Sequence, residues 1–379
     1  MSHNKILIFI DWFLPGYKAG GPIQSVSNLV RHLGDTFDFS IVTSNKDLGD
    51  KQPYENLICN SWIDRDHYRI IYLDNLHQNI KHYKKLMAEQ SYHAVYLNSL
   101  FSFSFNILPL ITLRKSKIKI VLAPRGMLGE GALNIKKRKK QVFLCLLKSS
   151  GIVNKITWQG TALSEVDEIK QRIGKDMTVK LAPNLSAKML DKTNLKEKTK
   201  ERLNLFFLSR IATKKNLKAA LTYLLHIKKS YTIQFTIIGP IDESSYWHEC
   251  QNIISKMPDN VSVNYKGAVP NKDLAQYLSS QHFMLLPTFH ENFGHVIMES
   301  WQYACPVIIS DMTPWRSLES KKIGWDIPLS QPEEFITAIE AAAQMDQETY
   351  NEWSVSSFNF AKKFCNNEGV LKANKELFK

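Results

Sequence analysis

The stretch Phe283-Met-Leu-Leu-Pro-Thr-Phe-His-Glu-Asn-Phe-Gly-His-Val-Ile-Met-Glu-Ser300 contains a strand, a loop and the start of a helix. The apolar run 283–286 has the length of a buried strand, and Gly294 opens an amphipathic segment. Glu291 is therefore predicted in the strand-to-helix loop and Glu299 on the helix. The dipole and free N–H groups of such a helix N-terminus favour an anion such as a diphosphate. Both carboxylates could then accept hydrogen bonds from hydroxyl groups beside that anion.

Strand and helix patterns alternate through the first half of the chain. An apolar strand at 5–10 precedes Gly20-Gly21, and Pro22 suits the first position of a helix whose apolar residues recur at helical spacing up to Leu33. Such alternation predicts an α/β domain with a parallel sheet. Further strands are predicted at 39–43, 68–73, 94–98, 118–123, 155–158 and 179–182.

A second α/β half begins at the apolar run 203–208. Two such halves are expected to bind a ligand outside the carboxyl ends of their strands. The predicted organisation is a first domain at 1–187, a charged linker at 188–202, a second domain at 203–350 and a helical tail at 351–379. The other strands of the second half are predicted at 232–238, 261–266, 283–286, 307–309 and 325–327.

Composition agrees with a two-domain globular protein, because 379 residues exceed the usual size of one core. The five cysteines, at 59, 145, 250, 305 and 365, form no C-x-x-C pair, which favours reduced thiols and a cytoplasmic protein.

The apolar run 6–10 is strand length, so no signal peptide is expected. The uncharged stretch 97–113 contains Pro109 and polar residues. A strand followed by a helix is therefore expected there rather than a membrane span.

The chain is basic, with a net charge of +13. Such proteins meet phosphates, nucleic acids or anionic membranes. Five cations at 136–140 precede the apolar run 142–147. This pattern is typical of a segment that docks on an anionic membrane surface. The alternative is a solvated first turn followed by a buried helix.

The spacing of Glu291 and Glu299 and the run Asn292-Phe293-Gly294 resemble the E-x7-E signature of retaining family-4 glycosyltransferases. Residues 306–311 match the strand that follows this signature in the family. The resemblance implies an α/β GT-B fold, in which two Rossmann-like α/β/α domains face a central cleft. It also implies that the tail crosses back to the first domain.

Two further loops extend the resemblance. The run 209–217 looks like the family's arginine-lysine loop, and 15–22 is similar to its glycine-rich first loop. The family pattern assigns Arg210 and Lys215 to the pyrophosphate, where a guanidinium and an ammonium stabilise the departing nucleotide. The family often has Gly where this chain has Asn216, a difference that leaves both charges in place.

The resemblance implies that Glu291 holds donor-sugar hydroxyls and is catalytic together with Arg210 and Lys215. Glu299 would hold the ribose. The other expected donor-binding residues come from the same loop, from the first loop and from the end of a core strand: Asn292, Phe293, Gly294, Gly20, Gly21 and Gly239.

On the acceptor side, Arg125 and Tyr17 are the candidates. Arg125 lies in Ala123-Pro-Arg-Gly-Met127, at the end of a predicted strand, where it could hold the acceptor or a donor phosphate. Thr161 and Glu165 resemble a family segment at the cleft in which His is frequent at the position of Gln159. No His aligns with the family's sugar-contacting His, so the acceptor-activating base is unassigned.

The triplet Asp64-Arg-Asp66 is a competing signal, because metal-dependent glycosyltransferases of the other major fold use D-x-D to bind a cation and a diphosphate. It lies in a polar run before a strand, and no metal-ligand spacing of His residues accompanies it. No metal or other cofactor is therefore expected.

The resulting expectation is a retaining glycosyltransferase at the inner face of the membrane. Its expected partners are a nucleotide sugar, a glycan or lipid-linked acceptor such as an O-antigen or capsule precursor, and an anionic membrane surface. The rivals are a nucleotide-sugar epimerase on the same fold and a basic nucleic-acid-binding protein. The second rival lacks a recognisable binding module, so no nucleic acid is expected.

Overall fold

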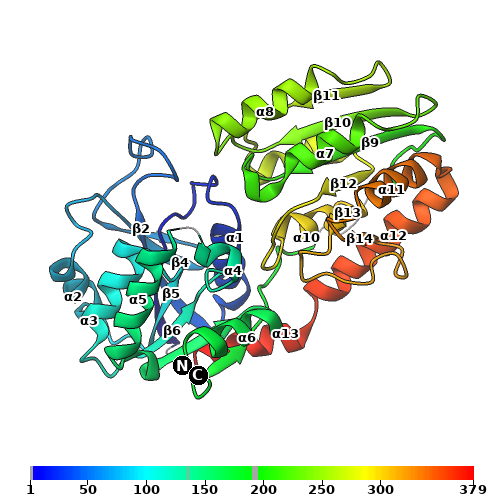
Figure 1. The fold of residues 1–379 in the computed structure, drawn as a ribbon. Coiled ribbons are helices and arrows are strands. Elements are labelled where there is room, and N and C mark those ends of the chain that lie inside the picture. Colours follow the sequence, from blue (N-terminus) through cyan, green and yellow to red (C-terminus); the bar gives the residue numbers. More distant parts are fainter. Residues whose placement is uncertain (1–2, 135, 190–194) are drawn as a thin grey trace. The chain divides into compact units, whose positions relative to one another are not determined.

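The computed structural model describes residues 3–134, 136–189 and 195–379. The chain divides into two compact units, shown in Figure 1. The first comprises Met1–Ala187 and Asn367–Lys379, and the second comprises Lys188–Asn366. Each unit contains a sheet with helices packed on it, which is the α/β architecture predicted from the alternating pattern.

The first unit has an eight-stranded sheet in the order β3-β4-β2-β1-β5-β6-β7-β8. All described neighbours pair in parallel except β3 and β4. The strands are β1 (Asn4–Phe9), β2 (Phe37–Ser44), β3 (Trp62–Arg65), β4 (Tyr68–Leu73), β5 (Ala94–Asn98), β6 (Lys119–Ala123), β7 (Ile156–Gly160) and β8 (Val179–Leu181).

Helices cover both faces of this sheet, which is why its central strands are continuously apolar. In β1, Ile6 and Ile8 face one buried cluster, and Leu7 and Phe9 face the other. The first cluster includes residues of α1 (Gly21–Leu33) and the C-terminal end of the chain. The opposite cluster includes residues of α2 (Ile80–Ala88), α3 (Leu108–Leu113), α5 (Lys137–Ser149) and α6 (Leu163–Arg172). The shorter helices are α4 (Glu130–Asn134), the π-helix η1 (Phe103–Ile107) and the 3-10 helix η2 (Ile152–Lys155).

One strand was missed by the sequence pattern. Residues 62–65 form the edge strand β3, which pairs antiparallel with β4. Asp64-Arg-Asp66 does precede strand β4, as predicted, but Asp64 and Arg65 also belong to β3, which was not predicted. Strand β3 has only four residues, two partly buried and two exposed, so no apolar run marks it in the sequence.

The second unit has a six-stranded sheet in the order β11-β10-β9-β12-β13-β14, and every pair is parallel. The strands are β9 (Arg202–Leu208), β10 (Thr232–Ile238), β11 (Val261–Tyr265), β12 (Phe283–Leu286), β13 (Val307–Ser310) and β14 (Gly324–Ile327). The helices are η3 (Thr213–Lys215), α7 (Leu217–Leu224), α8 (Ser244–Ile254), η4 (Asn271–Asp273), α9 (Leu274–Leu278), α10 (His295–Gln302), α11 (Pro332–Gln344) and α12 (Gln347–Cys365).

The chain returns to the first unit later than predicted. Residues 351–366 belong to the second unit, because α12 packs against α10 and Ser354 Oγ donates to the carbonyl oxygen of Ala304 at 2.8 Å. The return begins at Asn367, whose side chain caps α13 (Glu368–Leu377). Helix α13 packs on α1 and β8 in the first unit.

The predicted linker 188–202 lies partly outside the described residues, at 190–194. In its described part, two lysine side chains are buried rather than solvated. Lys196 and Lys198 are 8% and 5% exposed, and Gln347 hydrogen bonds to the backbone of both residues. This segment is therefore part of the second unit.

Candidate active site at the carboxyl ends of the strands

In the second unit, the loop after β9 is hydrogen bonded to the loop after β12. Phe289 N and Thr288 Oγ1 donate to the carbonyl oxygen of Lys214 at 2.9 and 3.1 Å. Asn216 Nδ2 donates to the carbonyl oxygen of Pro287 at 2.9 Å. These bonds hold the predicted arginine-lysine loop against the predicted Glu291 loop.

Asn216 has two roles in this contact. Its backbone is left-handed, with φ 58° and ψ 40°, a conformation that Gly and Asn adopt most readily. The Gly that family members often have at this position would share the backbone conformation but would lack the side-chain bond to Pro287.

Lys215 and Glu291 form an ion pair between the two loops, from Lys215 Nζ to Glu291 Oε1. The side chains are only 14% and 12% exposed. Glu291 N also donates to the carbonyl oxygen of Met312 at 2.9 Å, which fixes the loop. The structure thus brings together two of the three residues expected to be catalytic.

Arg210, the third of these residues, is paired differently. Its Nη1 lies 2.6 Å from Asp242 Oδ2, and both side chains are about one-third exposed. Asp242 follows β10, so this pair joins the loops after β9 and β10. Asp242 was not predicted, and no motif in the sequence marks it.

The N-terminus of α10 lies at Gly294, as predicted. Gly294 has φ 77° and precedes the first helical residue, His295. The Phe293 ring is buried against Trp315, whose Nε1 donates to the carbonyl oxygen of Phe293 at 2.7 Å. Packing of Phe293 therefore sets the direction in which the helix begins.

Glu299 lies one helical turn into α10. Its Oε1 accepts a hydrogen bond from Asn271 Nδ2 at 3.0 Å, and burial raises the pKa of the carboxyl group to about 7. Asn271 belongs to η4 and was not predicted as a site residue. Hydroxyl groups of a ligand that donate hydrogen bonds to this carboxyl group would favour its charged form.

Gly239 ends β10 beside the arginine loop. Its φ is 146°, and a Cβ atom there would lie 1.9 Å from the carbonyl oxygen of Ser209. Only Gly allows the two chain segments to approach this closely. Gly239 therefore sets the path of the backbone next to Arg210.

In the first unit, the loop after β1 is held by Asp47. Asp47 Oδ2 accepts hydrogen bonds from Tyr17 N at 2.8 Å and Lys18 N at 3.1 Å, while the Tyr17 side chain is 37% exposed. Gly20 has φ 66° and precedes α1, which begins at Gly21. The three predicted residues of this loop thus lie at the carboxyl end of β1 and the N-terminus of α1.

Arg125 follows β6, also at the carboxyl edge of the first sheet. Its Nη2 donates to the Tyr96 hydroxyl at 2.8 Å and to Asn98 Oδ1 at 2.7 Å, and its Nη1 donates to Asn184. Among the described residues, Arg125 Nε and Asn98 Nδ2 are buried and make no hydrogen bond. Two unsatisfied donors at one strand edge favour an acceptor-bearing ligand there.

Glu165 is hydrogen bonded to two loops at the carboxyl edge of the first sheet. It is 1% exposed and accepts hydrogen bonds from Gly126 N at 2.6 Å and from Thr161 N and Oγ1 at 2.8 and 2.6 Å. Gln159 joins Tyr96 to the carbonyl oxygen of Ala182. The segment that resembles a cleft segment of the family therefore supports the Arg125 loop.

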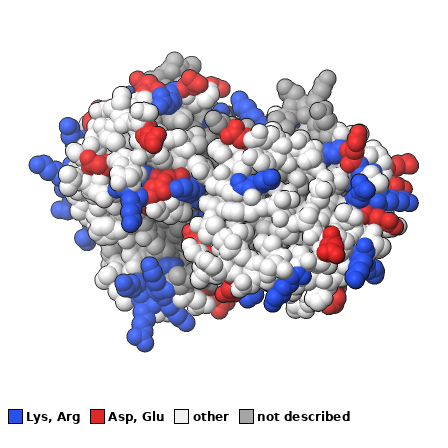
Figure 2. Space-filling model, turned by 90° about the horizontal axis from the view of Figure 1, so that it is seen from above, with Lys and Arg blue, Asp and Glu red and all other residues white. Residues whose placement is uncertain are grey.

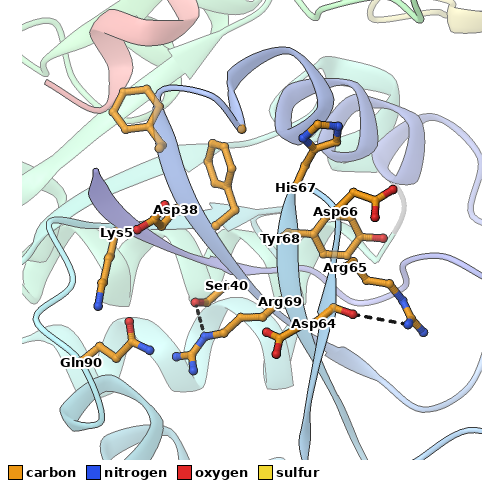
Figure 3. Close-up of a pocket in the computed structure, with 13 residues that line it drawn as sticks. Lys5, Asp38, Ser40, Asp64, Arg65, Asp66, His67, Tyr68, Arg69 and Gln90 are labelled. Atoms are coloured by element: carbon orange, nitrogen blue, oxygen red, sulfur yellow. Dashed lines mark hydrogen bonds between the residues drawn. The ribbon is translucent and has the colours of Figure 1, made fainter. Parts of the chain in front are cut away.

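The Asp64-Arg-Asp66 triplet lies elsewhere. Its residues line a hollow of about 350 Å³ formed by the amino-terminal ends of β1, β2 and β4, on the sheet edge opposite the sites described above. Figure 3 shows the two carboxylates well apart, with Arg69 bonded to Ser40 between the strands. Within the described part of the chain, no three His, Cys, Asp or Glu side chains are grouped so that they could hold a metal ion.

The basic segment forms the start of α5. Residues Lys136 to Lys139 are exposed, whereas Lys140 is half-buried, with its Nζ 2.6 Å from the carbonyl oxygen of Ala132 and over the Phe101 ring. In α5 only Leu144 and Leu147 are buried, and Val142 and Leu146 are 61% and 64% exposed. The expectation of a buried apolar helix therefore holds for only one side of α5.

Across the described residues, no helix combines the length and the hydrophobicity that crossing a membrane requires.

Both units resemble solved structures of GT-B proteins. Sucrose-phosphate synthase from Thermosynechococcus elongatus matches with a TM-score of 0.75 at 15% identity, covering 100% of this chain and 98% of that one. WaaG, a glycosyltransferase involved in lipopolysaccharide biosynthesis, matches with a TM-score of 0.69 at 11% identity, covering 98% and 99%. Anabaena HepE in complex with UDP and glucose also has a TM-score of 0.69, at 14% identity and with 99% and 98% covered. The fold is therefore GT-B, as predicted.

Sequence comparison indicates the class of protein. Residues 190–358 match the model of the family described as glycosyl transferases group 1, a range that spans most of the second unit. A Klebsiella pneumoniae protein described as an uncharacterized 41.2 kDa protein in the cps region is 24% identical over 250 residues. That match covers 60% of this chain and 63% of the relative's length. Together the findings support a glycosyltransferase.

Proposed function

We propose that the protein is a retaining glycosyltransferase that moves a sugar from a nucleoside diphosphate to a glycan acceptor. The observation that carries this proposal is the Lys215–Glu291 pair. It joins the loops after β9 and β12, next to the N-terminus of α10. A cation, a carboxylate and free helical N–H groups there match the diphosphate and hydroxyl groups of a nucleotide sugar.

Lys215 and Glu291 exchange partners when the donor binds. The diphosphate attracts the Lys215 ammonium group more strongly than one carboxylate does, because it carries more negative charge. Glu291 is then released to accept hydrogen bonds from sugar hydroxyls. In the free protein the pair neutralises both mostly buried charges, so neither is left buried without a partner.

Arg210 and Glu299 act at the two ends of the nucleotide. Arg210 leaves Asp242 for the pyrophosphate and stabilises the charge that develops on the leaving nucleoside diphosphate. Glu299, beside Asn271, accepts hydrogen bonds from the ribose hydroxyls. The backbone at Gly239 and Gly294 allows close approach to the phosphates.

The reaction needs no nucleophile from the protein. The acceptor oxygen forms a bond to the anomeric carbon on the face from which the nucleoside diphosphate departs, so the configuration is retained. The acceptor proton passes to the departing phosphate oxygen. No metal ion is required in this reaction, because Arg210, Lys215 and the helix N-terminus supply the positive field.

The acceptor side is assigned to the first unit. Arg125 Nε and Asn98 Nδ2 are the buried donors with which an acceptor hydroxyl or a phosphate would bond, and Tyr17 and the Gly20-Gly21 turn lie on the same strand edge. The cps-region relative and the fold shared with WaaG support a capsule or lipopolysaccharide precursor as acceptor. A lipid-linked acceptor places the protein at the inner face of the membrane, with the exposed cations and apolar residues of α5 on an anionic surface.

The two rivals are less well supported. An epimerase on this fold needs no acceptor, yet the first unit offers unsatisfied donors at its strand edge. On the face shown in Figure 2, Lys and Arg gather in separate groups rather than in a continuous band. Nucleic-acid binding favours a continuous basic groove that follows the backbone.

Acceptor-dependent release of nucleoside diphosphate tests the proposal. The protein is incubated with UDP- and GDP-sugars, with and without lipid-linked glycans from a capsule-producing cell. Release that requires the glycan and is lost in Lys215→Ala but kept in Lys214→Ala supports it. Conversion of the donor sugar without any acceptor would show an epimerase instead.

A further inference from the structure

Two buried lysines anchor the segment that leads into β9. Residues 195–199 alternate between exposed and buried, so Lys196 and Lys198 point into the second unit. Lys198 Nζ donates to three carbonyl oxygens, those of Thr199, Ala343 and Met345, each at 2.9 Å. Two of these oxygens are at the C-terminal end of α11, where a cation is favoured by the helix dipole.

Lys196 differs from Lys198 in one contact. Its Nζ donates to the carbonyl oxygens of Gln281 and Tyr303 at 2.8 Å each, but its third contact is Cys305 Sγ at 2.7 Å. Sulfur is a larger atom than oxygen and a weaker acceptor, yet it lies closer to the amine than either oxygen does. The Lys196 side chain is thus packed directly on a cysteine that is fully buried.

No carboxylate of the described residues accounts for this arrangement. The salt bridges among the described residues pair other lysines with acids, and none includes Lys196. Burial raises the pKa of the Cys305 thiol, and the Lys196 contact opposes that shift. An amine and a thiol held in contact, away from bulk water, are placed for a reaction with each other rather than with solvent.

We propose that Lys196 Nζ and Cys305 Sγ are a modification site, at which oxidation joins them through one bridging oxygen atom. The present separation leaves room for a single atom between nitrogen and sulfur. A direct nitrogen–sulfur bond would instead require the two residues to move closer.

The oxidant is molecular oxygen. One N–H bond of the Lys196 amine, the S–H bond of Cys305 and the O–O bond break. One N–O bond and one S–O bond form, and the second oxygen atom leaves as water with the two hydrogens. Nitrogen and sulfur each lose two electrons, and these four electrons reduce the oxygen molecule. Two molecules of hydrogen peroxide supply the same oxidation and leave three molecules of water.

The crosslink would join the segment before β9 covalently to the residues before β13, within the second unit. It joins residues 109 positions apart in the sequence, so it closes a loop that contains β9 to β12 and α10. Closing a long loop reduces the freedom of the unfolded chain. The oxidised protein is therefore expected to unfold at a higher temperature than the reduced protein.

Mass spectrometry of the wild-type protein is the primary test. After incubation with oxygen or peroxide, the intact protein should gain one oxygen and lose two hydrogens, and dithiothreitol should reverse the change. Trypsin should no longer cut after Lys196, and the peptide containing Lys196 should be joined to the peptide containing Cys305. A crosslink without the oxygen would overturn the bridging-oxygen assignment.

Matched variants identify the residues involved. Lys196→Gln and Cys305→Ser should abolish the crosslink and the reductant-dependent shift in unfolding temperature. Lys198→Gln removes an equally buried lysine, and Cys250→Ser removes another buried cysteine, so both should keep the crosslink. If Cys305 of the oxidised wild-type protein still reacts as a free thiol after unfolding, or carries oxygen without a link to Lys196, the proposal is wrong.

Discussion

At the residue scale, the ion pair of Lys215 and Glu291 distinguishes the site from a solvated loop. Exposed ion pairs contribute little, but these side chains are mostly shielded and join two separate loops. Sequence alone indicated both residues through family resemblance. It did not indicate that they contact each other, because their partnership depends on the bonds between the loops after β9 and β12.

Glu291→Gln is expected to lower kcat by about 10²-fold or more while changing the dissociation constant of the nucleoside diphosphate by less than tenfold. The reason is that contacts to the reacting sugar tighten as charge develops, and the proposed function assigns Glu291 to the sugar and not to the nucleotide. Steady-state kinetics and calorimetric titration measure the two quantities. Equal, mild effects on both would place Glu291 outside the site.

The raised pKa of Glu299 gives a second expectation. Ribose hydroxyls favour the carboxylate, so nucleotide affinity should fall as the pH drops through about 7. Glu299→Gln should bind more weakly and lose this part of the pH dependence. Titrations of both proteins between pH 5.5 and pH 8.5, roughly 1.5 units on either side of the cited pKa, measure it. The nucleotide's own ionisation is common to both proteins, and identical pH profiles would refute the ribose contact.

The same shift has a consequence for stability. The folded-state pKa of Glu299 lies above its ordinary value of 4.5, so the stabilising contribution is complete below 4.5 and is lost as the pH rises through about 7. The wild-type unfolding temperature should therefore fall relative to that of Glu299→Gln across this window. A constant difference between the two proteins would contradict the burial of the carboxyl group.

At the element scale, the buried strands were predicted well, whereas edge strand β3 and the return of the chain to the first unit were not. The runs 68–73, 94–98, 232–238 and 283–286 have the predicted bounds because buried parallel strands are short apolar runs. Edge strand β3 carries no such run. The return to the first unit was placed at 351 instead of 367, because helical pattern alone does not show that α12 packs on α10.

The site residues missed by the sequence share one property. Asp242 is an ordinary polar residue in a loop, Asn271 begins the short helix η4, and Asn98 ends a strand. Each acquires a role only from a partner far away in the sequence. No local motif could have identified them, whereas the charged and glycine-rich loops were found because their residue types are unusual together.

Gly239→Ala should destabilise the second unit by roughly 2–4 kcal/mol, because the new Cβ would meet the carbonyl oxygen of Ser209 and the backbone would be strained. Gly267→Ala is the matched control. Its φ is also positive, at 73°, but a Cβ there has open space, so the cost should be about 1 kcal/mol. Denaturant unfolding measures both, and equal losses would remove the argument for close approach at Gly239.

At the scale of the whole molecule, the proposed function assigns the donor to the second unit and the acceptor to the first. Helix α5 is the segment proposed to contact the membrane. Each cation near an anionic surface contributes about 1 kcal/mol, screened within a Debye length. Binding to anionic but not neutral liposomes is therefore expected, with loss at high salt.

Two variants separate the charge from the apolar contribution in α5. Replacing Lys136, Lys137, Arg138 and Lys139 by Gln should abolish liposome binding and leave nucleotide affinity unchanged. Val142→Ser with Leu146→Ser should weaken binding at all salt concentrations. Sedimentation with liposomes measures both. If the Gln variant sediments as well as the parent protein, these residues form only a solvated surface.

Calorimetric titration of UDP and GDP in EDTA tests the central claim, that the second unit holds a nucleoside diphosphate by its own charges. One of the two should bind, and at a hundredfold excess over its dissociation constant it should stabilise the protein by about 2.7 kcal/mol. Lys215→Ala should weaken this binding by at least about tenfold, and Lys214→Ala should leave it nearly unchanged. Binding that appears only when manganese is added, or that survives in Lys215→Ala, would contradict the account.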